Sequence, residues 1–241
     1  ARRRFFGGKV YDVVLRSTRE LAMNELGSRR RPHLPRLYVI VDAVVTASAG
    51  WRPPDLARAY VEGGARLVQL RAPDTAADTV LRWSEEIASV CVSAGAEFIL
   101  NDRSDLALLS NASGVHLGQE DLPAPVARRL LGAQAVIGLS THNLGQVQSA
   151  LRQPVSYLAV GPIFDTRTKD TGYVSVGLDG VRRTVAAASG LPVVAIGGIT
   201  LATAPTVIAA GAASVAVVSD LLANGAPDQR VRQYLAMLEG S

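Results

Sequence analysis

The chain has 241 residues, of which 48% are apolar and 19% charged, and its formal net charge is +4. This length suits one large domain with a sizeable core. A single cysteine excludes a disulfide framework within the chain, no residues have zinc-site spacing, and no apolar run reaches the roughly 18 residues of a membrane span. With no secretion signal, we expect a cytoplasmic protein that binds no membrane.

The basic residues are unevenly distributed. Residues 1–36 carry ten Arg or Lys and three Asp or Glu, a net charge of +7, whereas 37–241 carry 15 and 18, a net charge of −3. The basic character therefore belongs to the N-terminal segment and does not indicate a nucleic-acid partner for the main body. The apolar pattern of residues 11–26 predicts an amphipathic helix, and we expect it to pack on the main body or on a second subunit. We expect a basic, partly helical extension over 1–36, one domain over 37–241, and a homo-oligomer.

From residue 37 onward, short apolar runs alternate with helical patterns. The runs are rich in Val, Ile and Leu without strict alternation, which is typical of parallel strands covered on both faces. The predicted strands are 37–43, 66–71, 97–102, 114–117, 135–140, 157–162, 192–197 and 214–219. The predicted helices are 53–62, 75–94, 123–131, 143–151, 178–188 and 202–210.

Eight strand–helix units in about 205 residues predict an α/β fold of the (β/α)8 type, a TIM barrel near the lower end of its size range. A doubly wound open sheet is the alternative, because a strand count does not prove closure. Polar residues at the C-terminal ends of many different strands favour the barrel, whose active site is built from all the strand–helix loops.

Acidic residues follow two neighbouring predicted strands. Asp102 ends the third strand, and Asp121 comes shortly after the fourth. Two carboxylates on adjacent strand ends can share Mg²⁺, which keeps several waters and often takes substrate phosphates as ligands. The alternative for Asp102 is the N-cap of a following helix. The presence of both residues favours the metal site.

Three loops have the composition of phosphate-binding segments. Gly198 follows the seventh strand and Ser219 ends the eighth, the two positions that commonly hold phosphate in a barrel. After the sixth strand come Thr166, Thr168 and Lys169, the lysine being the only one in 37–241. Two hydroxyls and an ammonium group can surround phosphate oxygens, whereas the alternative is ordinary loop residues.

Polar side chains also end or interrupt the predicted strands. Gln69 and Arg71 point to the same side of the second strand. An inward arginine is costly unless it meets an anion, so Arg71 is predicted to bind phosphate. His116 alternates with apolar neighbours and is predicted to be a hydrogen-bonded core imidazole, with catalysis as the alternative. Of the two histidines we place His142 nearer to the site.

Taken together, these motifs resemble the thiamine phosphate synthase family over essentially all of 37–241. The segments that carry the resemblance are, in chain order, LYVIVD, LVQLR, ILNDRSDLAL, GVHLGQEDLP, IGLSTH, LAVGPIFDTRTK, VVAIGGI and VAVVS. The resemblance implies a TIM-barrel transferase. Such an enzyme joins 4-amino-2-methyl-5-hydroxymethylpyrimidine diphosphate to 4-methyl-5-(2-hydroxyethyl)thiazole phosphate, with Mg²⁺, by a dissociative displacement that releases pyrophosphate.

The resemblance also implies a role for each matching residue. Asp102 and Asp121 would ligate Mg²⁺, and the catalytic residues would be Arg71, Ser140 and Lys169. The pyrimidine and its diphosphate would be held by Gln69, Arg71, Asn101, Ser140 and Lys169. The thiazole phosphate would be held by Thr166, Thr168, Gly198, Val218 and Ser219.

One position departs from the family pattern. The family usually has a lysine two residues after the second-strand arginine, and this chain has Pro73. We expect retained activity with weaker diphosphate binding, unless Arg103 or another residue supplies the missing contact. The alternative functions are a thiazole tautomerase relative using His142, another phosphate-binding barrel such as an epimerase or isomerase, and a non-catalytic protein that binds through its basic arm.

Overall fold

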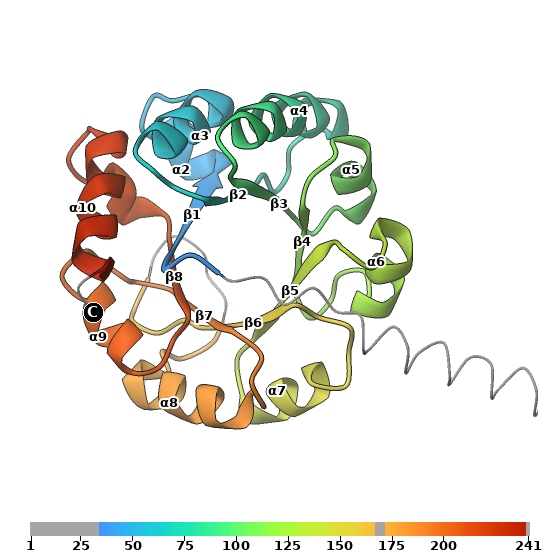
Figure 1. The fold of residues 1–241 in the computed structure, drawn as a ribbon, viewed down its shortest axis with the longest axis vertical. Coiled ribbons are helices and arrows are strands. Elements are labelled where there is room, and N and C mark those ends of the chain that lie inside the picture. The colour runs from blue at the N-terminus through green and yellow to red at the C-terminus, as the bar shows by residue number, and fades with distance from the viewer. Residues whose placement is uncertain (1–33, 167–171, 240–241) are drawn as a thin grey trace, which may run out of the picture.

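The computed structural model describes residues 34–166 and 172–239. The predicted helix over 11–26, and nearly all of the 1–36 extension, lie outside these residues. Eight parallel strands close into a barrel in sequence order (Figure 1). The strands are β1 (Leu37–Asp42), β2 (Leu67–Arg71), β3 (Glu97–Asn101), β4 (Gly114–Leu117), β5 (Val136–Thr141), β6 (Tyr157–Val160), β7 (Val193–Ile196) and β8 (Ser214–Val217).

The pairing of the first and last strands decides whether the sheet is closed, which the number of strands could not. β1 pairs with β8 in parallel, with Val39 opposite Val217, as well as with β2. The first and last strands are therefore neighbours, and no strand of the sheet is left with an open edge. The predicted (β/α)8 barrel is confirmed, and the open doubly wound sheet is excluded.

The helices form an outer ring around the strands (Figure 1). Their bounds are α2 (Ala43–Ser48), α3 (Pro53–Glu62), α4 (Ala77–Ser93), α5 (Ser104–Leu109), α6 (Ala124–Leu131), α7 (Leu144–Ala150), α8 (Gly177–Ala187), α9 (Ala204–Ala209) and α10 (Pro227–Glu239), with a 3₁₀ turn η1 (Ser219–Leu222). Sequence analysis did not predict α2, α5, η1 or α10. The first three have four to six residues, too few for a 3.6-residue period to show. The longer helix α10, which was also not predicted, packs against α3, α9 and η1.

Two apolar cores follow from the strand alternation. Outward-facing strand residues such as Val39 and Leu70 pack against the helices in the larger core. Inward-facing residues such as Tyr38, Ile40 and Tyr157 fill the barrel interior. Because successive strand residues face opposite sides, one strand supplies both cores.

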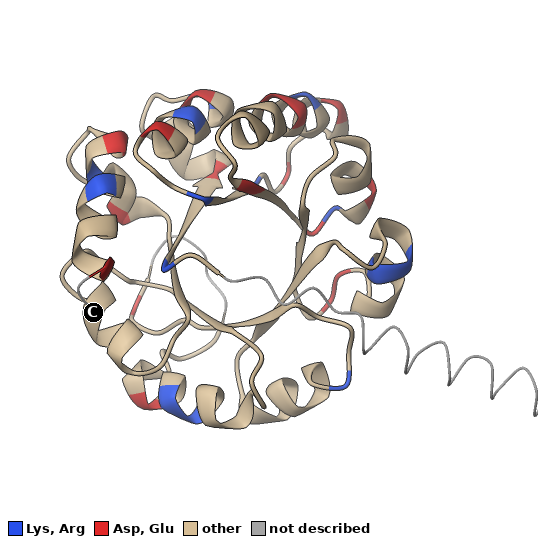
Figure 2. Ribbon diagram, in the orientation of Figure 1, with Lys and Arg blue, Asp and Glu red and all other residues tan. Residues whose placement is uncertain are grey.

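Charged residues lie mainly on the outer helices and their loops, and the strands contain few of them (Figure 2). The few charges at strand ends therefore stand out. Among the described residues, no helix is long and apolar enough to cross a membrane.

Candidate active site

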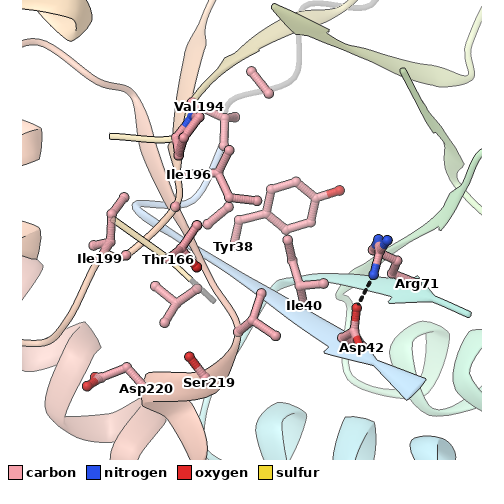
Figure 3. Close-up of a pocket in the computed structure, with 18 of the residues that line it drawn as sticks. Tyr38, Ile40, Asp42, Arg71, Thr166, Val194, Ile196, Ile199, Ser219 and Asp220 are labelled. Atoms are coloured by element: carbon pink, nitrogen blue, oxygen red, sulfur yellow. Dashed lines mark hydrogen bonds and ion pairs between the residues drawn. The ribbon is translucent and has the colours of Figure 1, made fainter. Parts of the chain in front are cut away.

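A cavity of about 680 Å³ occupies the barrel and is bounded by the loops that follow the strands. Figure 3 shows two polar regions on opposite sides of it. Asp42 and Arg71 lie on one side, and Thr166 and Ser219 lie on the other, with apolar side chains such as Ile40 between them. A cavity with two polar regions can hold two anionic groups.

Most of the described residues that the sequence predicted for the site line this cavity. They are Gln69, Arg71, Asn101, Ser140, Thr166, Gly198, Val218 and Ser219. Thr168 and Lys169 lie outside the described residues. Asp102 and Asp121 are described but are not among the residues lining the cavity.

Arg71 is held by a carboxylate that sequence analysis did not single out. Its Nη1 donates to Oδ2 of Asp42, whose side chain is 2% exposed. The other oxygen, Oδ1, accepts the backbone N–H groups of Val44 and Val45 at 3.1 and 3.2 Å and so caps α2. Asp42 therefore joins the start of α2 to the guanidinium. The only sequence signal was an acidic residue ending an apolar strand.

The two predicted metal ligands follow neighbouring strands. The backbone N–H of Asp102 donates to the carbonyl of His116 at 2.8 Å, which joins the end of β3 to β4. Asp121 follows β4, and its Oδ2 accepts the Gly118 N–H at 2.6 Å. The N-cap position of α5 is Arg103, whose side chain makes no capping hydrogen bond.

The donor set suits a hard cation. Among the described residues, no group of three or more His, Cys, Asp or Glu could hold a metal by itself. Mg²⁺ needs no such group, because one or two carboxylates, waters and substrate phosphates complete its six oxygen ligands. Asp102 and Asp121 are the two carboxylates that the sequence predicts for this role.

The loop after β7 packs tightly against the loop after β6. Gly197 and Gly198 have φ angles of +102° and +64°. A Cβ atom on Gly198 would lie 2.5 Å from the backbone oxygen of Asp165. The sequence placed this glycine in a predicted phosphate-binding loop, and the structure adds that close packing against the neighbouring loop itself requires a glycine here.

Asp220, next to Ser219, links this end of the cavity lining to the outer helices by hydrogen bonds. Its Oδ2 accepts the backbone N–H of Leu201 at 3.1 Å, Arg230 Nη2 at 2.8 Å and the Tyr234 hydroxyl at 2.5 Å. Burial, and then the hydrogen bond to Asp220, raise the pKa of Tyr234, so this hydroxyl remains a donor. The loops after β7 and β8 are thus joined to α10. Sequence analysis did not identify Asp220.

Both barrel histidines line the cavity. His116 Nδ1 lies 2.9 Å from the Tyr157 hydroxyl, and its Nε2 lies 2.9 Å from Ser140 Oγ. The prediction of a hydrogen-bonded core imidazole is confirmed. The Nδ1 of His142 donates to the Gly161 carbonyl at 2.7 Å, since a carbonyl can only accept. Its position near the site is confirmed too.

Comparison with known proteins identifies the family. The family model described as thiamine monophosphate synthase matches residues 37–221. The chain belongs to the thiamine monophosphate synthase family.

Two relatives in this family are similar over nearly their whole length. The thiamine-phosphate synthase of Chlorobium luteolum is 38% identical over 86% of this chain and 94% of its own. That of Chloroflexus aurantiacus is 40% identical over 84% and 92%. Among solved structures, a thiamine phosphate pyrophosphorylase from Pyrococcus furiosus superposes with a TM-score of 0.78 at 29% identity, covering 87% of this chain and 98% of that one.

Among the described residues, Arg103, the candidate to replace the family's lysine at the Pro73 position, does not line the cavity. Pro73 is not among the residues lining the cavity, and its carbonyl accepts the Thr75 hydroxyl at 3.2 Å. Arg103, considered above as a replacement, donates from Nε and Nη2 to the Asp105 carboxylate at 2.9 and 2.6 Å. Its guanidinium is therefore already engaged at the surface.

Proposed function

We propose that this chain is a Mg²⁺-dependent thiamine phosphate synthase, a transferase that joins the pyrimidine diphosphate to the thiazole phosphate named above and releases pyrophosphate. The observation that carries the proposal is the cavity with two separate polar regions, in a chain of this family (Figure 3). Two anionic substrates need two such regions with room between them for the reacting groups.

The proposed substrate-binding residues fall into the two polar regions of the cavity. The pyrimidine lies against Gln69 and Ser140, with its diphosphate toward Asn101 and Arg71. The thiazole phosphate lies on the opposite side, at Thr166, Gly198, Val218 and Ser219. Lys169 and Thr168, which lie outside the described residues, are assigned to the diphosphate and to the thiazole phosphate by the family resemblance alone. This arrangement brings the thiazole nitrogen toward the pyrimidine methylene and so supplies catalysis by proximity.

The reaction needs charge stabilisation more than a nucleophile. The bond between the pyrimidine methylene carbon and the diphosphate oxygen breaks with its electron pair leaving on pyrophosphate, and the thiazole nitrogen then bonds to that carbon. Arg71, oriented by Asp42, stabilises the departing charge together with Lys169. Asp102 and Asp121 would hold Mg²⁺, which when bound offsets the charge of the leaving group.

The direct test is incubation of the full chain with both substrates and Mg²⁺, following pyrophosphate release. We expect release only when both substrates are present. The absence of turnover with both present would overturn the proposal. Arg71→Ala should lower the rate by about 10²–10³, the usual effect of removing one stabilising donor.

One observation favours a second candidate, a thiazole tautomerase. Because His142 Nδ1 donates to the Gly161 carbonyl, the neutral imidazole keeps a basic lone pair on Nε2, and the residue lines the cavity. A tautomerase would isomerise a thiazole phosphate without any pyrimidine substrate. Incubation with the thiazole tautomer alone therefore distinguishes the two activities.

We also propose that the protein is a cytoplasmic homo-oligomer. Leu109 on α5 and Leu130 on α6 are 61% and 41% exposed, and these two helices pack side by side. Exposed leucines on two adjacent helices support association of copies. Sedimentation velocity should give a mass above that of one chain, and a monomer would contradict this.

A further inference from the structure

An uninterrupted series of side-chain hydrogen bonds crosses the barrel interior from β2 to β5. Gln69 Nε2 donates to the Tyr38 hydroxyl at 2.7 Å, and the Tyr38 hydroxyl lies 3.1 Å from that of Tyr157. The Tyr157 hydroxyl lies 2.9 Å from His116 Nδ1, and His116 Nε2 lies 2.9 Å from Ser140 Oγ. Gln69 and Ser140 belong to the proposed pyrimidine site, whereas the three residues between them, of which Tyr38 and His116 also line the cavity, were given no role in it above.

The linking residues are buried and keep their hydroxyl protons. Tyr38 and Tyr157 are 1% and 0% exposed, and His116 is 9% exposed. Burial is the main cause that raises the pKa of both tyrosines well above the ordinary value. Each tyrosine therefore has one O–H to donate at neutral pH, and a buried hydroxyl without an acceptor is unfavourable.

Only one direction of donation along this series gives every buried donor an acceptor. The Gln69 amide nitrogen can only donate, so the Tyr38 oxygen accepts from it. In the described part of the chain, the Tyr38 hydroxyl has the Tyr157 hydroxyl as its one remaining partner. Tyr38 therefore donates to Tyr157, and Tyr157 donates to Nδ1 of His116. The reverse order would leave the Tyr38 proton without an acceptor there.

The direction of these hydrogen bonds determines whether Ser140 can donate a proton into the cavity. With Nδ1 accepting, the neutral imidazole carries its proton on Nε2 and donates it to Ser140 Oγ. The Ser140 oxygen then has its own proton free for another group. Ser140 lines the cavity, so this proton is available to a bound molecule.

The backbone of β5 leaves space for this arrangement. Gly138 is opposite His116 on β4 and Tyr157 on β6. A Cβ atom at Gly138 would lie 2.1 Å from Tyr157 Cζ and 2.5 Å from His116 Nδ1. Any larger residue would occupy the position of the hydrogen bond between the two side chains. A missing side chain here thus makes room for the buried polar contact.

We propose that Tyr38, Tyr157 and His116 are positioning residues that set Ser140 as a hydrogen-bond donor to the bound pyrimidine. The inference rests on the proposed function for the identity of the substrate. Ser140 selects a hydrogen-bond acceptor, such as a ring nitrogen of an aminopyrimidine.

The proton order can be measured without turnover. The chain has three histidines, so ¹⁵N NMR of the imidazoles with His116→Gln as the reference identifies the His116 signals. We expect protonated Nε2 and unprotonated Nδ1 at neutral pH, and loss of this single tautomer in Tyr157→Phe. Protonated Nδ1 in the wild type, as the other tautomer or as imidazolium, would overturn the proposal even if the enzyme is active.

Steady-state kinetics test the effect of the linking residues on the use of the pyrimidine diphosphate. Tyr157→Phe keeps the ring and removes the link, and we expect kcat/KM for the pyrimidine diphosphate to fall about tenfold, comparable to one hydrogen bond. The KM for the thiazole phosphate should not change. In a Ser140→Ala background the same substitution should add little, because it acts through Ser140. Full additivity, or wild-type kinetics for Tyr157→Phe, would contradict the proposal.

A matched control separates this role from general packing. Tyr60 on α3 is fully buried, and its hydroxyl has no hydrogen-bond partner among the described residues. Tyr60→Phe should therefore keep wild-type kinetics. Should Tyr157→Phe fold poorly, Tyr38→Phe removes instead the hydroxyl that fixes the direction in which Tyr157 donates, and the single tautomer should again be lost. A wild-type enzyme without turnover would refute the proposed function alone, because the NMR measurement would still decide the proton order.

Discussion

Asp42 and Arg71 occupy paired positions on β1 and β2, and their side chains form an ion pair beside the cavity. The carboxylate is 2% exposed and the guanidinium side chain 21%. An arginine has five N–H donors, so a single bond to Asp42 orients the group and leaves others for an anion. The predicted phosphate-binding arginine thus depends on an acidic partner that fixes its direction.

Asp42→Asn should weaken use of the pyrimidine diphosphate. The amide oxygen can still cap α2, but the ion pair is lost, so we expect kcat/KM for this substrate to fall about tenfold. Steady-state kinetics measure the effect. Asp55→Asn is the control, because Asp55 pairs with Arg52 at 3.5 Å on the exposed surface and should be nearly neutral. Equal kinetics for both variants would contradict the positioning role.

Asp102→Asn and Asp121→Asn should each raise the Mg²⁺ concentration required for half-maximal pyrophosphate release. An amide oxygen is a weaker ligand than a carboxylate for a hard cation, and we expect a shift of about tenfold or more. Magnesium titrations at saturating substrate provide the measurement. Asp105→Asn, which removes an exposed partner of Arg103, should leave the titration unchanged. A wild-type titration in both site variants would rule out the metal assignment.

Pro73→Lys should strengthen diphosphate binding. A lysine two residues after Arg71 restores a cation that the family pattern contains, and we expect the KM for the pyrimidine diphosphate to fall severalfold. Pro73→Ala separates the added charge from the loss of the proline ring. An unchanged KM in Pro73→Lys, or the same decrease in Pro73→Ala, would show that this position does not contribute charge to the site.

Cys91 should make the free energy of unfolding decrease as the pH becomes alkaline. Burial raises the pKa of its thiol from 9.0 to about 12. Above about pH 9 the unfolded chain loses this proton while the folded chain keeps it, so the contribution to the free energy of unfolding decreases as pH rises toward 12. Urea unfolding of wild type and Cys91→Ala between pH 7 and about 11 measures the difference. Parallel pH profiles for the two proteins would contradict this prediction.

The strands were predictable because burial on both faces leaves a local signature. The predicted run 114–117 coincides with β4, and 66–71 differs from β2 by one residue. The six-residue helix α5 was missed because it is too short to show a helical period. Site residues at strand ends, such as Gln69 and Arg71, were found because alternation assigns both to the same face.

Other site residues were not predictable because their roles depend on partners. Asp42 was part of an apolar segment, and nothing local links it to Arg71, 29 residues away. Asp220 acquires its function from Leu201, Arg230 and Tyr234, which lie on a different loop and a different helix. A buried polar residue and its partners are brought together by the fold, and a pattern of period 2 or 3.6 contains no such information.

The sequence by itself determined the repeated strand–helix units, the sparse charges at strand ends and the resemblance to a family. Only the tertiary structure decided that the sheet closes and which inward side chains meet. Tyr38 and Tyr157 are 119 residues apart, and their hydroxyls touch because closure places inward residues of β1 and β6 in one interior. Alternation along a strand is a local property, whereas contact across a barrel depends on the register of every strand between.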